Sequence, residues 1–195
     1  MRLFGLTGGI GMGKSTCATL LADRGIRVVD TDDLAHSLTA PGRPALQEIS
    51  QHFGRHVLDG AGQLDRSALA RIVFNDAAAR ATLESILHPR IQAAWQATVS
   101  GWRQEGEALG VVVIPLLFET GAASQFAATV CVACSKASQQ ERLEQRGWTH
   151  ADCARRIAAQ LPIEDKLARS DYLVWSEGDP SVLPPQLARI FRVSP

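Results

Sequence analysis

The sequence lacks the features that are typical of membrane, secreted and nucleic-acid-binding proteins. It has no apolar run near the ~18 residues that a membrane-spanning helix requires, and its first residues read as a strand, not as a signal segment. Lys plus Arg and Asp plus Glu are equal at 20 each, so no net charge favours DNA, RNA or an anionic membrane. Internal repeats and low-complexity tracts are also missing. We therefore expect a cytoplasmic protein of one compact domain, with room for an inserted subdomain and with no nucleic-acid or membrane partner.

Cysteine is scarce, and the four cysteines do not form a convincing metal or redox set. Cys131 and Cys134 have the CxxC spacing of a redox pair or half a zinc site, but no second CxxC or clustered histidine pair accompanies them. They lie in a stretch that reads as a buried strand, where residues three apart face opposite sides of the sheet. We expect these two, with Cys17 and Cys153, to be small core residues, and a metal or redox site is the less favoured alternative.

Residues 8–15 carry the most informative pattern in the chain. They read Gly-Gly-Ile-Gly-Met-Gly-Lys-Ser and match Gly-x-x-x-x-Gly-Lys-Ser without a mismatch, directly after the apolar run at 3–7. Glycines allow consecutive backbone N–H groups to surround an anion, and the next helix directs its positive end at the same anion. A turn without a ligand would need only one or two glycines. The sequence therefore predicts that this loop binds a nucleoside triphosphate.

The pattern also assigns roles within the loop. Lys14 is predicted to reach the β- and γ-phosphates, and the Ser15 hydroxyl is predicted to ligate Mg²⁺. The predicted ATP-binding residues are Gly8, Gly9, Ile10, Gly11, Met12, Gly13, Lys14, Ser15 and Thr16.

Strands alternate with helices along the chain, which predicts an α/β fold with a parallel sheet covered by helices on both faces. The predicted strands are residues 3–7, 27–30, 111–114, 128–134 and 171–175. Helices are predicted at 14–24 and through 136–161. Between residues 33 and 103 helical periodicity dominates, with predicted helices at 45–53, 66–74, 77–87 and 89–102. This block is too helical for a simple crossover and reads as a subdomain.

A second chemical feature is the acidic cluster after the strand at 27–30. Strand periodicity places Asp30 and Asp32 on one side at the carboxyl end of the strand, where open α/β sheets bind ligands. A carboxylate there can accept the proton of an attacking hydroxyl or hold Mg²⁺. The alternative is that Asp32 or Asp33 caps a helix that begins at Leu34. We favour Asp32 as the catalytic residue and Asp33 as the cap.

Four stretches together resemble the dephospho-CoA kinase family. They are the loop region at 6–16, Val-Asp-Thr-Asp at 29–32, Leu-His-Pro at 87–89 and Ile-Pro-Leu-Leu-Phe-Glu at 114–119. The resemblance runs in order from residue 2 to residue 178. It implies transfer of the ATP γ-phosphoryl group to the 3′-hydroxyl of the dephospho-CoA ribose. It also implies a P-loop NTPase-like core (1–32, 104–135 and 166–195), a helical acceptor-binding subdomain (33–103) and a lid (136–165).

The resemblance assigns further residues. It implies that Asp32 is the base, and Arg146 and Arg156 align with basic residues of the family's lid. The position of Asp32 beside the expected γ-phosphate also makes it a predicted Mg²⁺ ligand with Ser15. Arg142 and Arg146 share a helix face that can meet transferred phosphate, although a solvated basic face is the alternative. His88 is either an acceptor contact or a capping or core histidine. A wall for the acceptor is predicted from Pro115, Leu116, Leu117, Phe118 and Glu119.

Three positions depart from the family pattern. Met12 stands where the family has a small residue, and His36 stands where it has arginine. Near the end, Trp-Ser-Glu-Gly at 175–178 lacks the asparagine that the family places in its adenine loop.

Sequence motifs that other classes of nucleotide-binding protein require are absent from this chain. A GTPase would need Asn-Lys-x-Asp and an ABC-type motor would need Ser-Gly-Gly, and neither occurs. Another small-molecule kinase, of the nucleoside, shikimate or gluconate type, would share the loop but not the His-Pro and Pro-Leu-Leu-Phe-Glu segments. We expect a monomer or a weak homo-oligomer.

Overall fold

The computed structural model describes residues 1–192, and the chain divides into two compact units. The sheet unit comprises Met1–Asp30 and the residues from Val99 onward, and the helical unit comprises Thr31–Thr98. The helical unit is thus an insertion between the second and third strands of the sheet.

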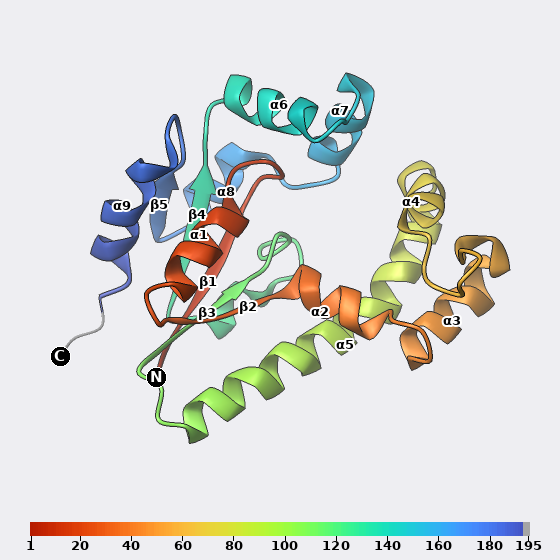
Figure 1. Ribbon diagram of the computed structural model, residues 1–195, viewed down its shortest axis with the longest axis horizontal. Helices are drawn as coiled ribbons and strands as arrows, with labels where there is room; N and C mark the ends of the chain where they lie inside the picture. The colour runs from red at the N-terminus through yellow and green to blue at the C-terminus, as the bar shows by residue number, and fades with distance from the viewer. Residues whose placement is uncertain (193–195) are drawn as a thin grey trace. The chain divides into compact units, whose positions relative to one another are not determined.

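Five parallel strands form the sheet, in the order β2-β3-β1-β4-β5 (Figure 1). The two central neighbours of β1 are buried at every residue, which is typical of a parallel sheet covered on both faces. The predicted α/β class with a parallel sheet is confirmed, and β2 has the predicted bounds. The strands are β1 (Arg2–Gly8), β2 (Arg27–Asp30), β3 (Leu109–Val113), β4 (Ala128–Ala133) and β5 (Tyr172–Trp175).

Helices cover both faces of this sheet. On one face, α1 (Lys14–Ala22) and α9 (Leu183–Ile190) pack over alternate apolar residues of the strands, among them Phe4 and Leu6. On the other face lie α8 (Ile163–Arg169), which contacts β1 and β4, and Trp102, which packs on Gly110. The prediction of helices on both faces is confirmed.

The segment predicted to be helical from 136 to 161 consists of two helices. α6 (Lys136–Gln145) and α7 (His150–Ala158) are separated at Gly147, whose φ of 80° ends the first helix, and the Thr149 side chain caps the second. The sequence reading also missed α8 and α9. Both are short, and Pro184 and Pro185 in the first turn of α9 read as a break although proline is tolerated there.

The helical unit packs around a small apolar cluster that includes Ile49, Val57, Leu69 and Ile86. No helix within residues 1–192 combines the length and apolar character needed to cross a membrane. The helices of this unit are α2 (Thr31–Leu38), α3 (Pro44–Phe53), α4 (Arg66–Asn75) and α5 (Ala77–Gln104), whose last residues belong to the sheet unit. The chain also has short 3₁₀ turns at Arg55–Val57, Ala122–Gln125 and Pro180–Val182.

Two predictions about helix starts are wrong. The predicted break at His88-Pro89 is absent, because α5 runs through Pro89 without interruption. A proline inside a helix costs ~3 kcal/mol, and here Leu83, Ile86 and Leu87 in the turns before Pro89 pack into the cluster of the helical unit and offset that cost. The helix predicted from Leu34 begins at Thr31 instead, so Asp32 and Asp33 lie in its first turn, where acidic side chains favour the positive helix end.

Candidate active site

The loop between β1 and α1 has the geometry of an anion cradle. A Cβ on Gly8 would lie 2.1 Å from the carbonyl oxygen of Val132, and Gly13 adopts a left-handed conformation with φ of 93°. A side chain at Gly8 would displace the backbone of β4, and a side chain at Gly13 would strain its left-handed backbone. The loop therefore lies against β4 at one end and turns directly into α1 at the other.

Positive charge converges on this loop. The Lys14 Nζ atom donates to the carbonyl oxygens of Gly8 and Gly9, each at 3.0 Å, so the ammonium lies against the loop. The first turn of α1 contains no acidic residue that would compete with an anion for the positive helix end. Ser15 and Thr16 are exposed in that turn, with a hydroxyl oxygen of the kind that Mg²⁺ accepts as a ligand.

Two glutamines that the sequence reading missed hold the middle of the loop. The Ile10 amide N–H donates to Gln160 Oε1 at 3.0 Å, and Gln139 Nε2 donates to the Ile10 carbonyl at 2.7 Å. The neighbouring Met12 is buried against Ala133 and Cys134. Separations of 129 and 150 residues in the chain give no local signal for these contacts.

The predicted lid arginines differ in their surroundings. Arg142 donates through both Nη atoms to Ser176, and Ser176 Oγ in turn donates to the Met12 carbonyl at 2.7 Å. Arg142 is therefore attached to the phosphate loop through the segment at 175–178. Arg146 is exposed at the end of α6, and the guanidinium of Arg156 stacks 4.2 Å above the Trp148 ring.

The segment 175–178, predicted to lie at the adenine, is held by more than Arg142. Glu177 accepts hydrogen bonds from the Ser135 N–H and hydroxyl and from the Ser138 hydroxyl at the start of α6. These bonds, the Ser138 hydroxyl first, hold the pKa of Glu177 below its ordinary value. The segment is thus joined both to α6 and to the phosphate loop, without the asparagine that the family pattern has.

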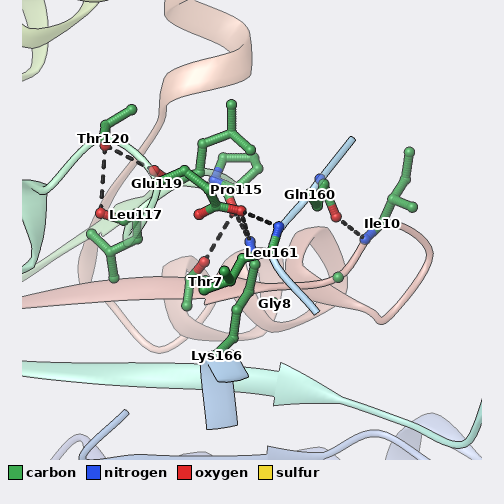
Figure 2. Close-up of polar contacts among 12 residues, drawn as sticks. Thr7, Gly8, Ile10, Pro115, Leu117, Glu119, Thr120, Gln160, Leu161 and Lys166 are labelled. Carbon is green, nitrogen blue, oxygen red and sulfur yellow. Dashed lines mark hydrogen bonds and ion pairs between the residues drawn. The ribbon is translucent and has the colours of Figure 1, made fainter. Parts of the chain in front are cut away.

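The segment predicted as an acceptor wall follows β3 at the same edge of the sheet. Leu117 is fully buried against Gly5, so its side chain is a core element. Pro115, Leu116 and Phe118 are half-buried. Glu119 accepts from the Leu161 N–H and pairs with Lys166, each at 2.8 Å (Figure 2).

Asp32 and His88 belong to the helical unit. Asp30 ends β2, but Asp32 lies in the first turn of α2, so the expected alternation of both on one strand side is wrong. Within the helical unit, the negative charge of Asp32 acts on Arg66 of α4, whose guanidinium donates to the Thr39 hydroxyl at 2.9 Å. Burial lowers the pKa of Arg66, and Asp32 opposes that shift. His88 is half-buried within α5.

The cysteines are core residues, as predicted. All four are buried free thiols, and burial raises the pKa of Cys17 to about 12 and that of Cys131 to about 11. Such thiols stay protonated near neutral pH and react slowly. Within residues 1–192, no three His, Cys, Asp or Glu side chains are grouped closely enough to hold a metal ion by themselves.

Comparison with known proteins identifies the family. The model of the family described as dephospho-CoA kinase matches residues 2–180. The chain belongs to the dephospho-CoA kinase family. A dephospho-CoA kinase of Anaeromyxobacter dehalogenans is 45% identical over 184 residues, which cover 94% of this chain and 87% of that protein. The predicted family and the predicted class of ATP-dependent kinase are confirmed.

Solved structures agree with this assignment. Dephospho-CoA kinase from Campylobacter jejuni superposes with a TM-score of 0.70 at 25% identity, covering 97% of this chain and 96% of its own. The structure of TT1252 from Thermus thermophilus superposes with a TM-score of 0.82 at 33% identity, covering 97% and 95%. The dephospho-CoA kinase fold therefore extends over nearly the whole chain.

Proposed function

We propose that this kinase transfers the γ-phosphoryl group of ATP to the 3′-hydroxyl of the dephospho-CoA ribose and releases ADP and coenzyme A. The observation that carries the proposal is the β1–α1 loop, in which two obligatory glycines, the Lys14 ammonium and the end of α1 converge on one anion position. Family membership supports dephospho-CoA as the acceptor over the nucleoside, shikimate or gluconate alternatives.

The loop from Gly8 to Thr16 binds the triphosphate. Lys14 leaves the carbonyl oxygens of Gly8 and Gly9 for the β- and γ-phosphates, a short movement that replaces neutral acceptors with charged ones. Ser15 and Asp32 are the residues that would hold Mg²⁺. When bound, Mg²⁺ neutralises charge on the phosphate oxygens.

Asp32 accepts the proton of the attacking 3′-hydroxyl. A carboxylate is sufficient for this step because the transition state of phosphoryl transfer is loose, and the hydroxyl is deprotonated late. The helical unit, which carries Asp32 and His88, binds the acceptor. The segment Pro115, Leu116, Leu117, Phe118 and Glu119 is also proposed to contact the acceptor, although Leu117 itself is fully buried.

The segment 136–165 acts as the lid. Its arginines Arg142, Arg146 and Arg156 supply positive charge to the phosphates as the lid closes and excludes water. Arg142 starts from a position beside the loop, held by Ser176, and Arg156 starts from its stack on Trp148. The protein acts in the cytoplasm as a monomer or weak homo-oligomer, without nucleic-acid or membrane partners.

One incubation tests the reaction. Purified protein with ATP, Mg²⁺ and dephospho-CoA should yield coenzyme A, identified by mass spectrometry from the added phosphoryl mass on the ribose. Parallel reactions with shikimate, gluconate and nucleosides should yield no phosphorylated product. Phosphorylation of one of these acceptors in place of dephospho-CoA would overturn the proposal.

A further inference from the structure

A continuous set of polar contacts connects the end of β1, just before the phosphate loop, to the middle of that loop. Thr7, the last residue of β1 before Gly8, donates its hydroxyl to the Pro115 carbonyl at 3.2 Å. The same carbonyl accepts from Lys166 Nζ at 2.6 Å. Lys166 pairs with Glu119, Glu119 accepts from the Leu161 N–H, and the adjacent Gln160 accepts from Ile10 (Figure 2).

The centre of this set is a buried ammonium group. The Lys166 side chain is 0% exposed, and α8 places it on the face of the sheet opposite α1. Burying a charge costs several kcal/mol unless close partners compensate, and the Pro115 carbonyl and the Glu119 carboxylate are those partners. Because methionine or leucine would fill this volume at lower cost, a charge kept here indicates a positioning role.

The connection from α7 to α8 therefore joins two parts of the active site. We call residues 160–166 the strap. At one end, Gln160 fixes the Ile10 peptide in the phosphate loop, and at the other, Lys166 fixes the segment from Pro115 to Glu119. Apolar packing supports the loop as well, because Ile163 and Leu167 of α8 pack against the cluster that contains Met12.

We propose that the strap pre-forms the phosphate loop for nucleotide binding, with Gln160, Lys166 and Glu119 as positioning residues. This inference rests on the proposed function for its place in catalysis, but its effect is on the loop itself. Ile10 is held at its N–H by Gln160 and at its C=O by Gln139, so the two peptide groups that flank Ile10 are both oriented before a phosphate arrives. A loop that is already formed loses less entropy on binding.

The test measures nucleotide binding, which does not depend on the acceptor. Gln160→Ala removes one hydrogen bond to the loop, so calorimetry should show affinity for a non-hydrolysable ATP analogue weakened about fivefold. Gln160→Met keeps the length of the side chain but not the amide oxygen, so it should weaken the affinity to the same degree as Gln160→Ala. The matched control is Gln145→Ala, because Gln145 is an exposed glutamine on α6 that bonds only to Glu141 among the described contacts.

A second experiment tests whether a change at Glu119 weakens nucleotide binding through the strap. Glu119→Ala removes the acceptor of the Leu161 N–H, so it should weaken the ATP analogue to a similar degree although Glu119 has no contact with the loop. Combined with Gln160→Ala, it should add little, since both changes release the same strap. Thermal unfolding of each variant checks that it folds. If Glu119→Ala does not fold, Glu119→Leu combined with Lys166→Met replaces it, because this pair removes the acceptor for Leu161 without leaving the buried Lys166 charge unpaired.

The outcomes separate the strap from the reaction. Unchanged analogue affinity in Gln160→Ala, or tighter binding because Gln160 competes with phosphate, overturns the inference. Fully additive effects of the two changes overturn it as well. If the wild-type protein binds the analogue but makes no coenzyme A, the proposed function fails while the strap remains supported by the binding data.

Discussion

The sheet unit and the helical unit differ in how much of their function is specified by local sequence. In the sheet unit, the loop geometry follows from adjacent residues: Gly8 has no space for a Cβ, and Gly13 has a left-handed backbone. In the helical unit, Asp32 and His88 lie within regular helices, where nothing in the backbone marks them as functional. A nucleotide site built from backbone can thus be read from sequence, whereas an acceptor site built from side chains needs a comparison with relatives.

The largest expected effect lies in the sheet unit. Lys14→Ala removes the ammonium that we propose contacts the β- and γ-phosphates, and we expect kcat to fall by roughly a thousandfold or more. Steady-state assays of ADP release check this, with circular dichroism to confirm folding. Because the loop is proposed to bind ATP and not the acceptor, raising dephospho-CoA to saturation should not restore activity. A fall of less than tenfold would contradict the role of Lys14.

The next change lies in the helical unit and should distinguish the proposed role of this unit in turnover from that of the sheet unit in nucleotide binding. Asp32→Asn keeps the shape of the side chain but removes the proton acceptor, so kcat should fall by about a hundredfold or more. Affinity for a non-hydrolysable ATP analogue should stay within about twofold, because the triphosphate is bound mainly by the loop of the sheet unit. Asp33→Asn, one residue away in the same helical turn, is the matched control. Unchanged turnover in Asp32→Asn would remove this residue from the mechanism.

The fold was more predictable than the site. The central strands β1, β3 and β4 were predicted from their apolar runs, because burial on both faces leaves a continuous apolar signal in the chain. The break at Pro89 was predicted wrongly, since the packing of α5 residues before Pro89 outweighs the local cost of proline. Contacts such as Gln160 with Ile10 and Glu119 with Lys166 join distant residues, and single residues of common type give no pattern for them.

Within the sheet unit, the lid arginines offer a finer comparison. Arg142 is attached to the phosphate loop through Ser176, and its Nη1 lies 3.9 Å from where a Cβ on Gly13 would be. Arg142→Ala should therefore cut kcat/KM for ATP about tenfold or more, because a charge-assisted contact beside the loop is lost. Arg146→Ala, exposed on the same helix, should have a smaller effect. Equal losses in both variants would show that position beside the loop does not decide the role.

The smallest effect is a change in the free energy of unfolding at alkaline pH that comes from buried thiols. Only the sheet unit can supply it, since residues 31–98 contain no cysteine. Burial raises the pKa of Cys131 to about 11 from an ordinary value of 9.0, against the opposing charges of Lys166 and Lys14. Between these values the unfolded chain loses the thiol proton while the folded chain keeps it. The free energy of unfolding should therefore fall as pH rises from about 9 to about 11.

Cys131→Ala isolates this contribution. The variant should unfold with a shallower alkaline dependence than the wild type, by up to ~1.4 kcal/mol per pH unit for one thiol. Urea unfolding at several pH values measures the slope, and the difference at pH 7 accounts for the lost packing of the sulfur. Part of the remaining slope should come from the Cys17 and Cys134 thiols, whose pKa values burial also raises. An unchanged slope in Cys131→Ala would mean that this thiol already ionises in the folded sheet unit, with Lys166 and Lys14 outweighing its burial.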